Sequence, residues 1–296
     1  MSYDLSSDPR FANLSGPKVM LVGPSGSGKT YSIRSLVDAG IEVFAIFTEP
    51  GFVSVVGDIP SDKLKWKYIA PASSSWDAML QSAQKINQLS FEGLTKLGGV
   101  NKQEHSQFLD FIATCNNFVD DRTGESFGDV STWGANRALF VDSLSGLNIM
   151  AMNLVVGSKP VKAPGEWAVA MDNLERVVQK LCMDLRAILV LTAHLERELD
   201  EVSGGVQLMA STLGRKLAPK IPRYFDDVVH CVRDGTEWRW STASLNVDLK
   251  ARNLQWSDKI QPSFAPLLQS WRRKAGLDPV TGEPLADRPS AETAKP

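Results

Sequence analysis

Short apolar runs alternate along the chain with stretches of helical periodicity. Runs that are long enough for a strand, each bounded by polar residues, lie at 18–22, 42–47, 66–70, 137–141 and 187–192. Apolar residues with helical spacing cover 29–39, 75–88 and 166–185. The first of these helices is expected to end at Gly40, which supplies a C-terminal cap. Strands that alternate with helices are typical of a mostly parallel sheet with helices on both faces, so the pattern predicts an α/β fold.

Two segments depart from this alternation. Residues 91–133 are polar and glycine-rich around a helical piece near 103–118, which predicts an insertion. Residues 274–296 contain four prolines and no apolar periodicity, which predicts a disordered tail. The expected organisation is therefore an N-terminal extension at 1–15, one domain over 16–273 and the tail.

Composition narrows the class of protein without indicating a function. Of the 296 residues, 43% are hydrophobic and 22% are charged, ordinary values that exclude a fibrous or wholly disordered chain. The 32 Lys and Arg nearly balance the 34 Asp and Glu, so the net charge is −2. Because no global positive field attracts nucleic acid, any such contact must come from a local basic patch.

The cysteines, the length of the apolar runs and the first residues of the chain indicate a cytoplasmic protein. Cys115, Cys182 and Cys231 are widely spaced and odd in number, which is typical of reduced intracellular thiols rather than of disulfides. The longest apolar runs have the length of a strand and are far too short to span a membrane. Residues 1–14 have no apolar core of a secretory signal, and no membrane partner is expected.

A glycine-rich motif lies where the first predicted strand turns into the first predicted helix. The segment Gly-Pro-Ser-Gly-Ser-Gly-Lys-Thr at 23–30 matches the phosphate-binding pattern GxxxxGK(S/T) in full. Glycines let backbone N–H groups turn toward phosphate oxygens, and the helix N-terminus adds the positive end of its dipole. The motif predicts a site for ATP with Mg²⁺, in which Lys29 contacts the β- and γ-phosphates and the Thr30 hydroxyl binds the metal. The expected nucleotide-binding residues are Gly23, Pro24, Ser25, Gly26, Ser27, Gly28, Lys29, Thr30 and Tyr31.

A P-loop also needs a metal-holding carboxylate at the end of a neighbouring strand, and Asp142 fits that requirement. It closes the run Arg-Ala-Leu-Phe-Val-Asp at 137–142, which has the pattern of a Walker B strand. We expect Asp142 to hold Mg²⁺ through water. The alternative is an aspartate that only begins an ordinary turn between a strand and a helix.

Hydrolysis of ATP requires a further group that activates or orients water. Ser143 rather than a glutamate follows Asp142, so the usual AAA+ arrangement, with a base beside the Walker B aspartate, is absent. Glu49 follows the strand at 42–47, at the carboxyl edge where such sheets bind ligands. Glu49 is therefore the candidate base, and the alternative is a solvated turn carboxylate.

These features together resemble the RecA-like P-loop ATPases. The likeness rests on the P-loop, the Glu after the next strand, the Asp-Ser pair of the Walker B strand and a polar residue after the run at 187–192, here His194. The resemblance implies that His194 senses the γ-phosphate and passes the nucleotide state to a following loop that contacts single-stranded DNA. It also implies that Lys250 and Arg252, two apart on a late strand, enter the ATP site of a neighbouring subunit and stabilise transition-state charge. The alternatives are a histidine that caps a strand and a solvated pair of charges.

Basic residues gather in the two segments that the resemblance assigns to DNA, 157–162 and 202–225, and the second segment has no acidic residue. Positive charge on a glycine-containing loop suits binding to a phosphate backbone, although two solvated basic loops would have the same composition. The candidate DNA contacts are Lys159, Lys162, Arg215, Lys216, Lys220 and Arg223.

Within this group the chain is most similar to phage-encoded proteins of single-strand annealing and recombination, over 18–252 with 91–133 unmatched. The leading prediction is an ATPase that acts on single-stranded DNA in recombination, annealing or replication. It would self-associate as a ring or filament with ATP at the subunit interfaces, and a single-strand-binding protein is a candidate partner. Two alternatives stay open: a ring-type DNA motor for unwinding or packaging, and a non-hydrolysing nucleotide-dependent switch or scaffold.

Overall fold

The computed structural model describes residues 15–71, 75–97, 104–199, 205–214 and 216–283. Its strands are β1 (Lys18–Val22), β2 (Glu42–Phe47), β3 (Leu64–Tyr68), β4 (Arg137–Asp142), β5 (Ile188–Ala193), β6 (Leu195–Leu199), β7 (Val206–Ala210), β8 (Asp227–Asp234), β9 (Glu237–Ser241) and β10 (Lys250–Ala251). Its α-helices are α1 (Ile33–Asp38), α2 (Val53–Val56), α3 (Trp76–Asn87), α4 (Phe91–Lys96), α5 (Gln107–Asn116), α6 (Leu144–Val156), α7 (Pro164–Asp184) and α8 (Ala265–Lys274). Its 3-10 helices are η2 (Thr30–Ser32), η3 (Pro50–Phe52), η5 (Val130–Thr132) and η6 (Ile221–Tyr224).

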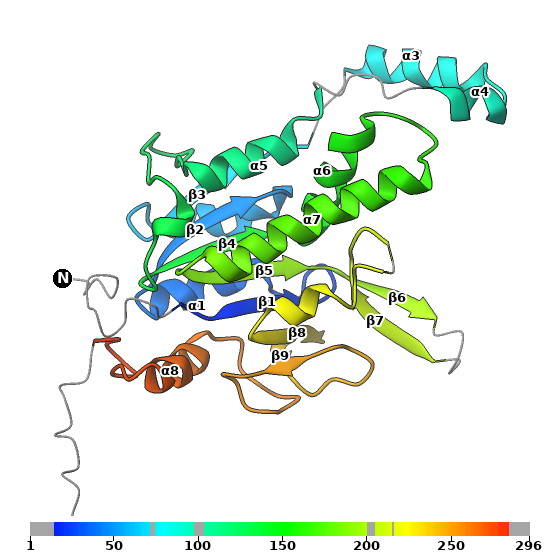
Figure 1. The fold of residues 1–296 in the computed structure, drawn as a ribbon. Coiled ribbons are helices and arrows are strands. Elements are labelled where there is room, and N and C mark those ends of the chain that lie inside the picture. The colour runs from blue at the N-terminus through cyan, green and yellow to red at the C-terminus, as the bar shows by residue number, and fades with distance from the viewer. Residues whose placement is uncertain (1–14, 72–74, 98–103, 200–204, 215, 284–296) are drawn as a thin grey trace, which may run out of the picture.

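Eight strands form the main sheet, which lies between helical layers in Figure 1. The hydrogen-bonded order is β10-β8-β1-β5-β4-β2-β3, and β9 pairs with β8. The strands from β8 to β3 in this order run parallel, whereas β9 and β10 are antiparallel to β8. The carboxyl ends of the parallel strands therefore meet at one edge, and the predicted α/β fold with a mostly parallel sheet is confirmed.

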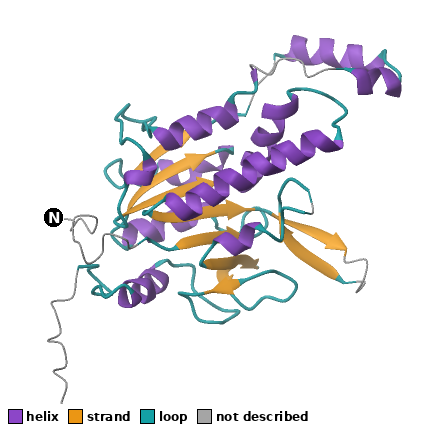
Figure 2. Cartoon of the chain, in the orientation of Figure 1, coloured by secondary structure: helices purple, strands orange, loops and turns teal. Residues whose placement is uncertain are grey.

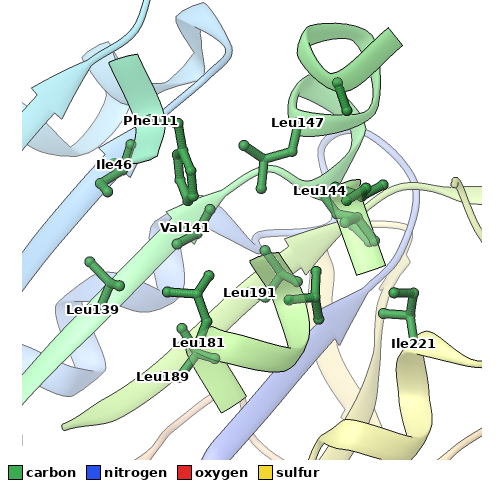
Figure 3. Close-up of a cluster of buried hydrophobic side chains, with 14 of the residues drawn as sticks. Ile46, Phe111, Leu139, Val141, Leu144, Leu147, Leu181, Leu189, Leu191 and Ile221 are labelled. Carbon is green, nitrogen blue, oxygen red and sulfur yellow. The ribbon is translucent and has the colours of Figure 1, made fainter. Parts of the chain in front are cut away.

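Successive residues of each central strand face different helical layers. Leu139 and Val141 of β4 belong to the cluster with α6 and α7, part of which is shown in Figure 3. Phe140 belongs to the cluster on the other face, with α1 and α8. A strand that is buried on both faces needs apolar residues throughout, which is why the strands appear in the sequence as continuous apolar runs.

The strands predicted at 18–22 and 42–47 have the same bounds in the structure, and Gly40 follows α1 with the positive φ of 80° expected of a cap. Helix α6 is absent from the prediction. It is apolar on every side, with Leu147, Met150 and Met152 among its buried residues, so no polar face marks it as an amphipathic helix.

Much of the segment 91–133, predicted to be a polar insertion, belongs to the core. Phe111 and Phe118 are fully buried, and Trp133 packs on Phe44 of β2 with ring centroids 4.2 Å apart. Helix α5 lies within the helical piece predicted near 103–118, and its buried side chains make it part of a helical layer of the fold. The apolar residues of α5 are close together, but the polar and glycine-rich stretches on either side of them favoured an insertion.

The C-terminal tail predicted at 274–296 starts later than expected. Leu277 is fully buried, and the Arg272 guanidinium donates a hydrogen bond to the carbonyl oxygen of Val280 at 2.8 Å. Residues 274–283 therefore belong to the folded domain, and residues 284–296 lie outside the described residues, as do residues 1–14 of the predicted N-terminal extension.

Lys18 ties the amino end of β1 to its surroundings, at the edge of the sheet away from the P-loop. Its side chain is buried, and its ammonium donates hydrogen bonds to the carbonyl oxygens of Gly16 at 2.8 Å and Ala187 at 2.7 Å. Burial lowers the pKa of Lys18 from 10.5 to about 8.

This shift makes stability depend on pH in the alkaline range. Between the two pKa values the unfolded chain binds a proton at Lys18 that the folded chain lacks, so the contribution of Lys18 to stability rises with pH. Relative to a Lys18→Met variant, the native protein should gain roughly 1 kcal/mol of unfolding free energy per pH unit in this window. Urea denaturation of both proteins across the window measures the gain, and a constant difference would contradict the lowered pKa.

Candidate nucleotide-binding site

The glycine-rich segment 23–30 turns between β1 and the helix that follows, at the carboxyl edge of the sheet. Gly26 and Gly28 have φ values of +75° and +84°, which L side chains rarely adopt. At Gly23 a Cβ atom would lie 2.4 Å from the carbonyl oxygen of Cys231, so close packing against β8 also requires glycine. The Gly23 N–H donates to the carbonyl oxygen of Ala193 at 3.1 Å and holds the loop to β5.

Lys29 folds back over this loop. Its side chain is buried, and its ammonium donates hydrogen bonds to the carbonyl oxygens of Gly23 at 2.7 Å and Pro24 at 2.9 Å. Burial lowers the pKa of Lys29, while Cys231, Asp142 and Glu49 act in the opposite direction. The cation therefore lies inside the loop, where phosphate oxygens would exchange with the two carbonyl oxygens.

Asp142 connects β4 to the P-loop and to β5. The Thr30 hydroxyl donates to Asp142 Oδ2 at 2.5 Å, and the Thr192 hydroxyl donates to Oδ1. The carboxylate is buried, which raises the pKa of Asp142, while the two hydroxyl groups act against that rise. Thr192 has no role in the sequence-based prediction, although its place at the end of a buried strand marks it as a candidate.

The oxygen atoms of Thr30 and Asp142 fit a magnesium ion. A hydroxyl and a carboxylate are the hard oxygen ligands that Mg²⁺ prefers, and a buried carboxylate gains from a nearby cation. Within the described residues, no group of three or more His, Cys, Asp and Glu side chains could hold a metal by itself. Mg²⁺ is therefore expected to arrive with a nucleotide, whose phosphates supply further ligands.

Glu49 lies at the same edge, after β2, and two side chains orient its carboxylate. The Ser143 hydroxyl donates to Oε1 at 2.6 Å, and His194 Nε2 lies 3.3 Å from Oε2. The hydrogen bond with His194 is the main cause that lowers the pKa of Glu49, and Ser143 and the charge of Lys29 lower it further. The structure thus brings together Lys29, Glu49 and His194, as the sequence predicts.

A close contact between β2 and α6 sets the spacing of Glu49 and Asp142. The Ser143 N–H donates to the Thr48 hydroxyl at 2.8 Å, and the Thr48 N–H donates to the carbonyl oxygen of Asp142 at 2.7 Å. A Cβ atom at Gly146 would lie 2.1 Å from the Thr48 hydroxyl oxygen. Only glycine allows the first turn of α6 to approach β2 this closely.

A Gly146→Ala variant should therefore be less stable than the native protein by roughly 1–3 kcal/mol, the usual effect of overpacking a core. Urea denaturation measures the change. Gly165→Ala, a helical position in α7 where the added Cβ would meet no atom within 4 Å, is the matched control. Equal stability of the two variants would contradict the close contact.

Trp238 of β9 lies against the P-loop, and the sequence-based prediction assigns it no role in nucleotide binding. Its indole N–H donates to the carbonyl oxygen of Gly26 at 3.1 Å, and its ring would be 3.2 Å from a Cβ atom at Gly28. The Arg233 guanidinium lies 5.4 Å from the ring centroid, within cation–π distance. Trp240, two residues later, is instead buried against Phe264.

The sheet order places Trp238 on one side of β1, and Asp142 and Glu49 on the other. Because the metal-binding end of a nucleotide is expected near Asp142, we expect the nucleoside end near Trp238. Trp238→Phe should weaken ATP binding by roughly 2- to 10-fold, because the P-loop would lose the hydrogen bond that holds Gly26 in its binding position. It should also abolish the ATP-dependent change in tryptophan fluorescence, which titration of both proteins measures. A fluorescence change that persists in the variant would contradict this placement.

The backbone of His194 contacts the segment that was predicted to be a basic loop. Its carbonyl oxygen accepts a hydrogen bond from the Ser211 N–H at 2.7 Å. Between these residues β6 and β7 form an antiparallel hairpin, which corrects the prediction of one continuous loop over 202–225. Residues 200–204 lie outside the described residues.

The first group of predicted DNA contacts lies in the turn between α6 and α7. The Lys159 ammonium forms an ion pair with Glu166 at 2.6 Å, and its side chain is only 15% exposed. The Lys162 ammonium lies 5.6 Å from the ring centroid of Trp167. Both cations have partners within the fold, so contact with DNA would have to displace them.

The second group lies beside α7 and is more open. Lys216 and Arg223 are exposed, and Lys220 is paired with Glu175 of α7 at 3.0 Å. Arg215 lies outside the described residues. Lys216 and Arg223 are therefore better placed than Lys159 to contact a ligand.

Lys250 and Arg252 lie at the other end of β8 from the P-loop of the same chain, because β10 pairs with the first residues of β8. The Lys250 ammonium donates to the carbonyl oxygen of Phe225 at 2.5 Å, and Arg252 forms an ion pair with Asp226 at 2.6 Å. Contact with ATP is therefore possible only at the site of a neighbouring subunit.

The arrangement of the phosphate-binding loop, the two acidic residues and the parallel sheet defines a RecA-like P-loop ATPase. The model of an AAA domain family matches residues 15–257, so the chain belongs to that family.

Other comparisons add little to this assignment. The crystal structure of the RadB recombinase matches at 14% sequence identity and a TM-score of 0.28, over 77% of this chain and 80% of that chain. A TM-score this low gives no support of its own to a shared fold. No curated protein sequence matches the chain. Within the described residues, no helix is both long and apolar enough to cross a membrane.

Proposed function

We propose that this protein hydrolyses ATP with Mg²⁺ and that single-stranded DNA stimulates the hydrolysis, in recombination, annealing or replication of a phage type. The observation that carries the proposal is the orientation of Glu49 by Ser143 and His194 beside the P-loop. A carboxylate held in this way is suited to orient a water molecule for attack on the γ-phosphate.

Each residue of the site has a distinct part in this proposal. Lys29 would exchange its two carbonyl partners for phosphate oxygens, and Thr30 and Asp142 would hold Mg²⁺. Bound Mg²⁺ supplies charge neutralisation on the phosphate oxygens. The lowered pKa of Glu49 keeps its carboxylate ionised at neutral pH, so it acts first as a hydrogen-bond acceptor that orients water.

In this proposal His194 connects the ATP site with the segment that would contact DNA. Its side chain lies beside Glu49, and its backbone accepts a hydrogen bond from Ser211, which precedes the exposed cations Lys216 and Arg223. The proposal includes self-association in the cytoplasm, with Lys250 and Arg252 of one copy at the ATP site of the next. A single-strand-binding protein is a candidate partner.

Steady-state ATP hydrolysis with and without single-stranded DNA tests the proposal. We expect stimulation by the DNA in the native protein and in Lys259→Ala, a control that removes an exposed cation elsewhere. We expect no stimulation in a Lys216→Ala/Arg223→Ala variant, whose basal rate should be unchanged. Stimulation that persists in this variant would exclude its cations as the DNA contact, and tight ATP binding without any hydrolysis would favour the switch. An unwinding assay would identify a motor.

A further inference from the structure

Thr192 is a polar residue within β5, a strand that is otherwise apolar and is buried along its whole length. Strands β5 and β4 are neighbours in the main sheet, whose strands are orange in Figure 2. Val141 of β4 pairs with Leu191 of β5, so the next residues of the two strands, Asp142 and Thr192, lie side by side. The Thr192 side chain is completely buried, and its hydroxyl donates a hydrogen bond to Asp142 Oδ1.

Packing alone does not call for a hydroxyl group at this position. Valine has nearly the same shape as threonine and suits a buried strand, as Val190 does in β5 itself. A buried hydroxyl without a hydrogen bond is costly, and a bonded one contributes only modestly to stability. This favours a role for the Thr192 hydroxyl in orienting its acceptor, Asp142.

Two hydrogen bonds from different elements hold the carboxylate of Asp142. Thr30, at the end of the P-loop, donates to Oδ2 at 2.5 Å, and Thr192 of β5 donates to Oδ1. A carboxylate that is held at one oxygen can turn about its Cβ–Cγ bond, whereas one that is held at both cannot turn without losing a hydrogen bond. Because each oxygen can accept more than one hydrogen bond, lone pairs remain for Mg²⁺ or its water ligands.

The two hydroxyl groups differ in how far nucleotide binding disturbs their surroundings. Thr30 is expected to bind Mg²⁺ through its hydroxyl oxygen, and it follows Lys29, which must release two carbonyl oxygens of the P-loop before it can contact phosphate. Thr192 belongs to a strand that is paired on both sides, with β1 and with β4. Thr192 therefore keeps its place while the contacts of the P-loop change.

We propose that Thr192 is a positioning residue for magnesium, whose hydroxyl holds the plane of the Asp142 carboxylate in the orientation that binding of Mg²⁺ or its water ligands requires. The inference rests on the nucleotide and magnesium site of the proposed function, but on neither hydrolysis nor DNA. Groups that orient a metal-binding side chain typically contribute roughly 10- to 100-fold to metal affinity. Because coupling between two ligands is reciprocal, loss of the hydroxyl should weaken by this factor the effect of Mg²⁺ on nucleotide binding.

Calorimetric titration with a non-hydrolysable ATP analogue tests the proposal without turnover. Each protein is titrated once with excess Mg²⁺ and once with a chelator of divalent metals, and the ratio of the two affinities is compared. In Thr192→Val this ratio should fall by roughly 10- to 100-fold, while the affinity in the chelator stays native and shows that the site is folded. Thr192→Ser keeps a hydroxyl group and should have the native ratio.

A second buried threonine provides the control. Thr242 is also completely buried, and its hydroxyl donates to the carbonyl oxygen of Gln255 at 2.7 Å, in the segment that follows β9. Thr242→Val should lower stability without changing the ratio, so it separates a general loss of packing from an effect on the metal. A native ratio in Thr192→Val would overturn the inference, as would a reduced ratio that Thr192→Ser fails to restore.

Failure of the proposed function would give a different result in the same titrations. If the native protein binds the analogue equally well with Mg²⁺ and with the chelator, or not at all, the magnesium site is absent, and both the proposed function and this inference are wrong. If Mg²⁺ strengthens binding to the same extent in the native protein and in Thr192→Val, this inference alone is wrong.

Discussion

Replacing Glu49 with glutamine is expected to lower kcat for ATP hydrolysis by roughly 100- to 10,000-fold, the usual effect of removing a positioned general base. Glutamine keeps the size of the side chain and can still accept the hydrogen bond from Ser143, but it has no negative charge with which to orient water. ATP affinity should stay close to that of the native protein, because Lys29, Thr30 and Asp142 are unchanged. Single-turnover hydrolysis and equilibrium binding of ATP measure the two quantities separately.

Glu237→Gln is the matched control for this experiment. It removes the same charge from β9, on the other side of the P-loop, where the carboxylate is exposed. Its hydrolysis rate should equal that of the native protein. If Glu49→Gln hydrolyses ATP as fast as the control, another group orients the water and the proposed role of Glu49 is wrong.

The second large effect is expected on binding. Lys29→Ala should weaken ATP binding by roughly 10- to 150-fold, because hydrogen bonds to charged groups contribute about 1.5–3 kcal/mol. The loss should be smaller for ADP, since the ammonium is expected to contact the γ-phosphate as well as the β-phosphate. Isothermal titration with Mg²⁺ and each nucleotide measures both affinities.

Lys63→Ala serves as the control for this variant, because it removes a cation that is 57% exposed and remote from the P-loop. The Lys63→Ala variant should bind ATP as tightly as the native protein does. Equal affinity of Lys29→Ala and the native protein for ATP would show that the nucleotide binds elsewhere, and the function proposed above would then lose its basis.

The nucleotide-binding edge is predictable because its information is local. Eight consecutive residues at 23–30 specify the phosphate-binding turn, and the polar residues Glu49, Asp142 and His194 each follow an apolar strand. Parallel strands end at one edge, so side chains that are distant in sequence meet there without any knowledge of the loops between them.

Features that depend on distant partners are not predictable in this way. Trp238 reaches Gly26 across 212 positions of sequence, and no local pattern marks that contact. The hairpin of β6 and β7 depends on pairing between two separate segments, and the basic residues that follow 206–210 favoured one loop over the whole of 202–225. Burial of Leu277 depends equally on a surface that the neighbouring residues do not reveal.

Helix α6 was missed in the sequence for a different reason. Its residues are apolar enough to be buried in any conformation, so composition predicts burial but not helical structure. The local signal for the start of the helix is the Ser143 side chain, which accepts a hydrogen bond from the Gly146 N–H at 3.3 Å and caps the first turn. In the sequence this serine is conspicuous only as the neighbour of Asp142.

Ala193, the last residue of β5, and His194, which follows it, contact parts of the molecule that are otherwise separate. The Ala193 carbonyl accepts a hydrogen bond from the P-loop at Gly23, while His194 contacts Glu49 with its ring and Ser211 with its backbone. Because His194 directly precedes β6, we expect a displacement of its side chain beside Glu49 to change the position of β6 and of β7, which pairs with it. Under the function proposed above, the position of the β6–β7 hairpin would then depend on which nucleotide the P-loop holds. By thermodynamic reciprocity, if bound nucleotide changes the affinity of the hairpin for another molecule, that molecule changes the affinity for nucleotide by the same factor.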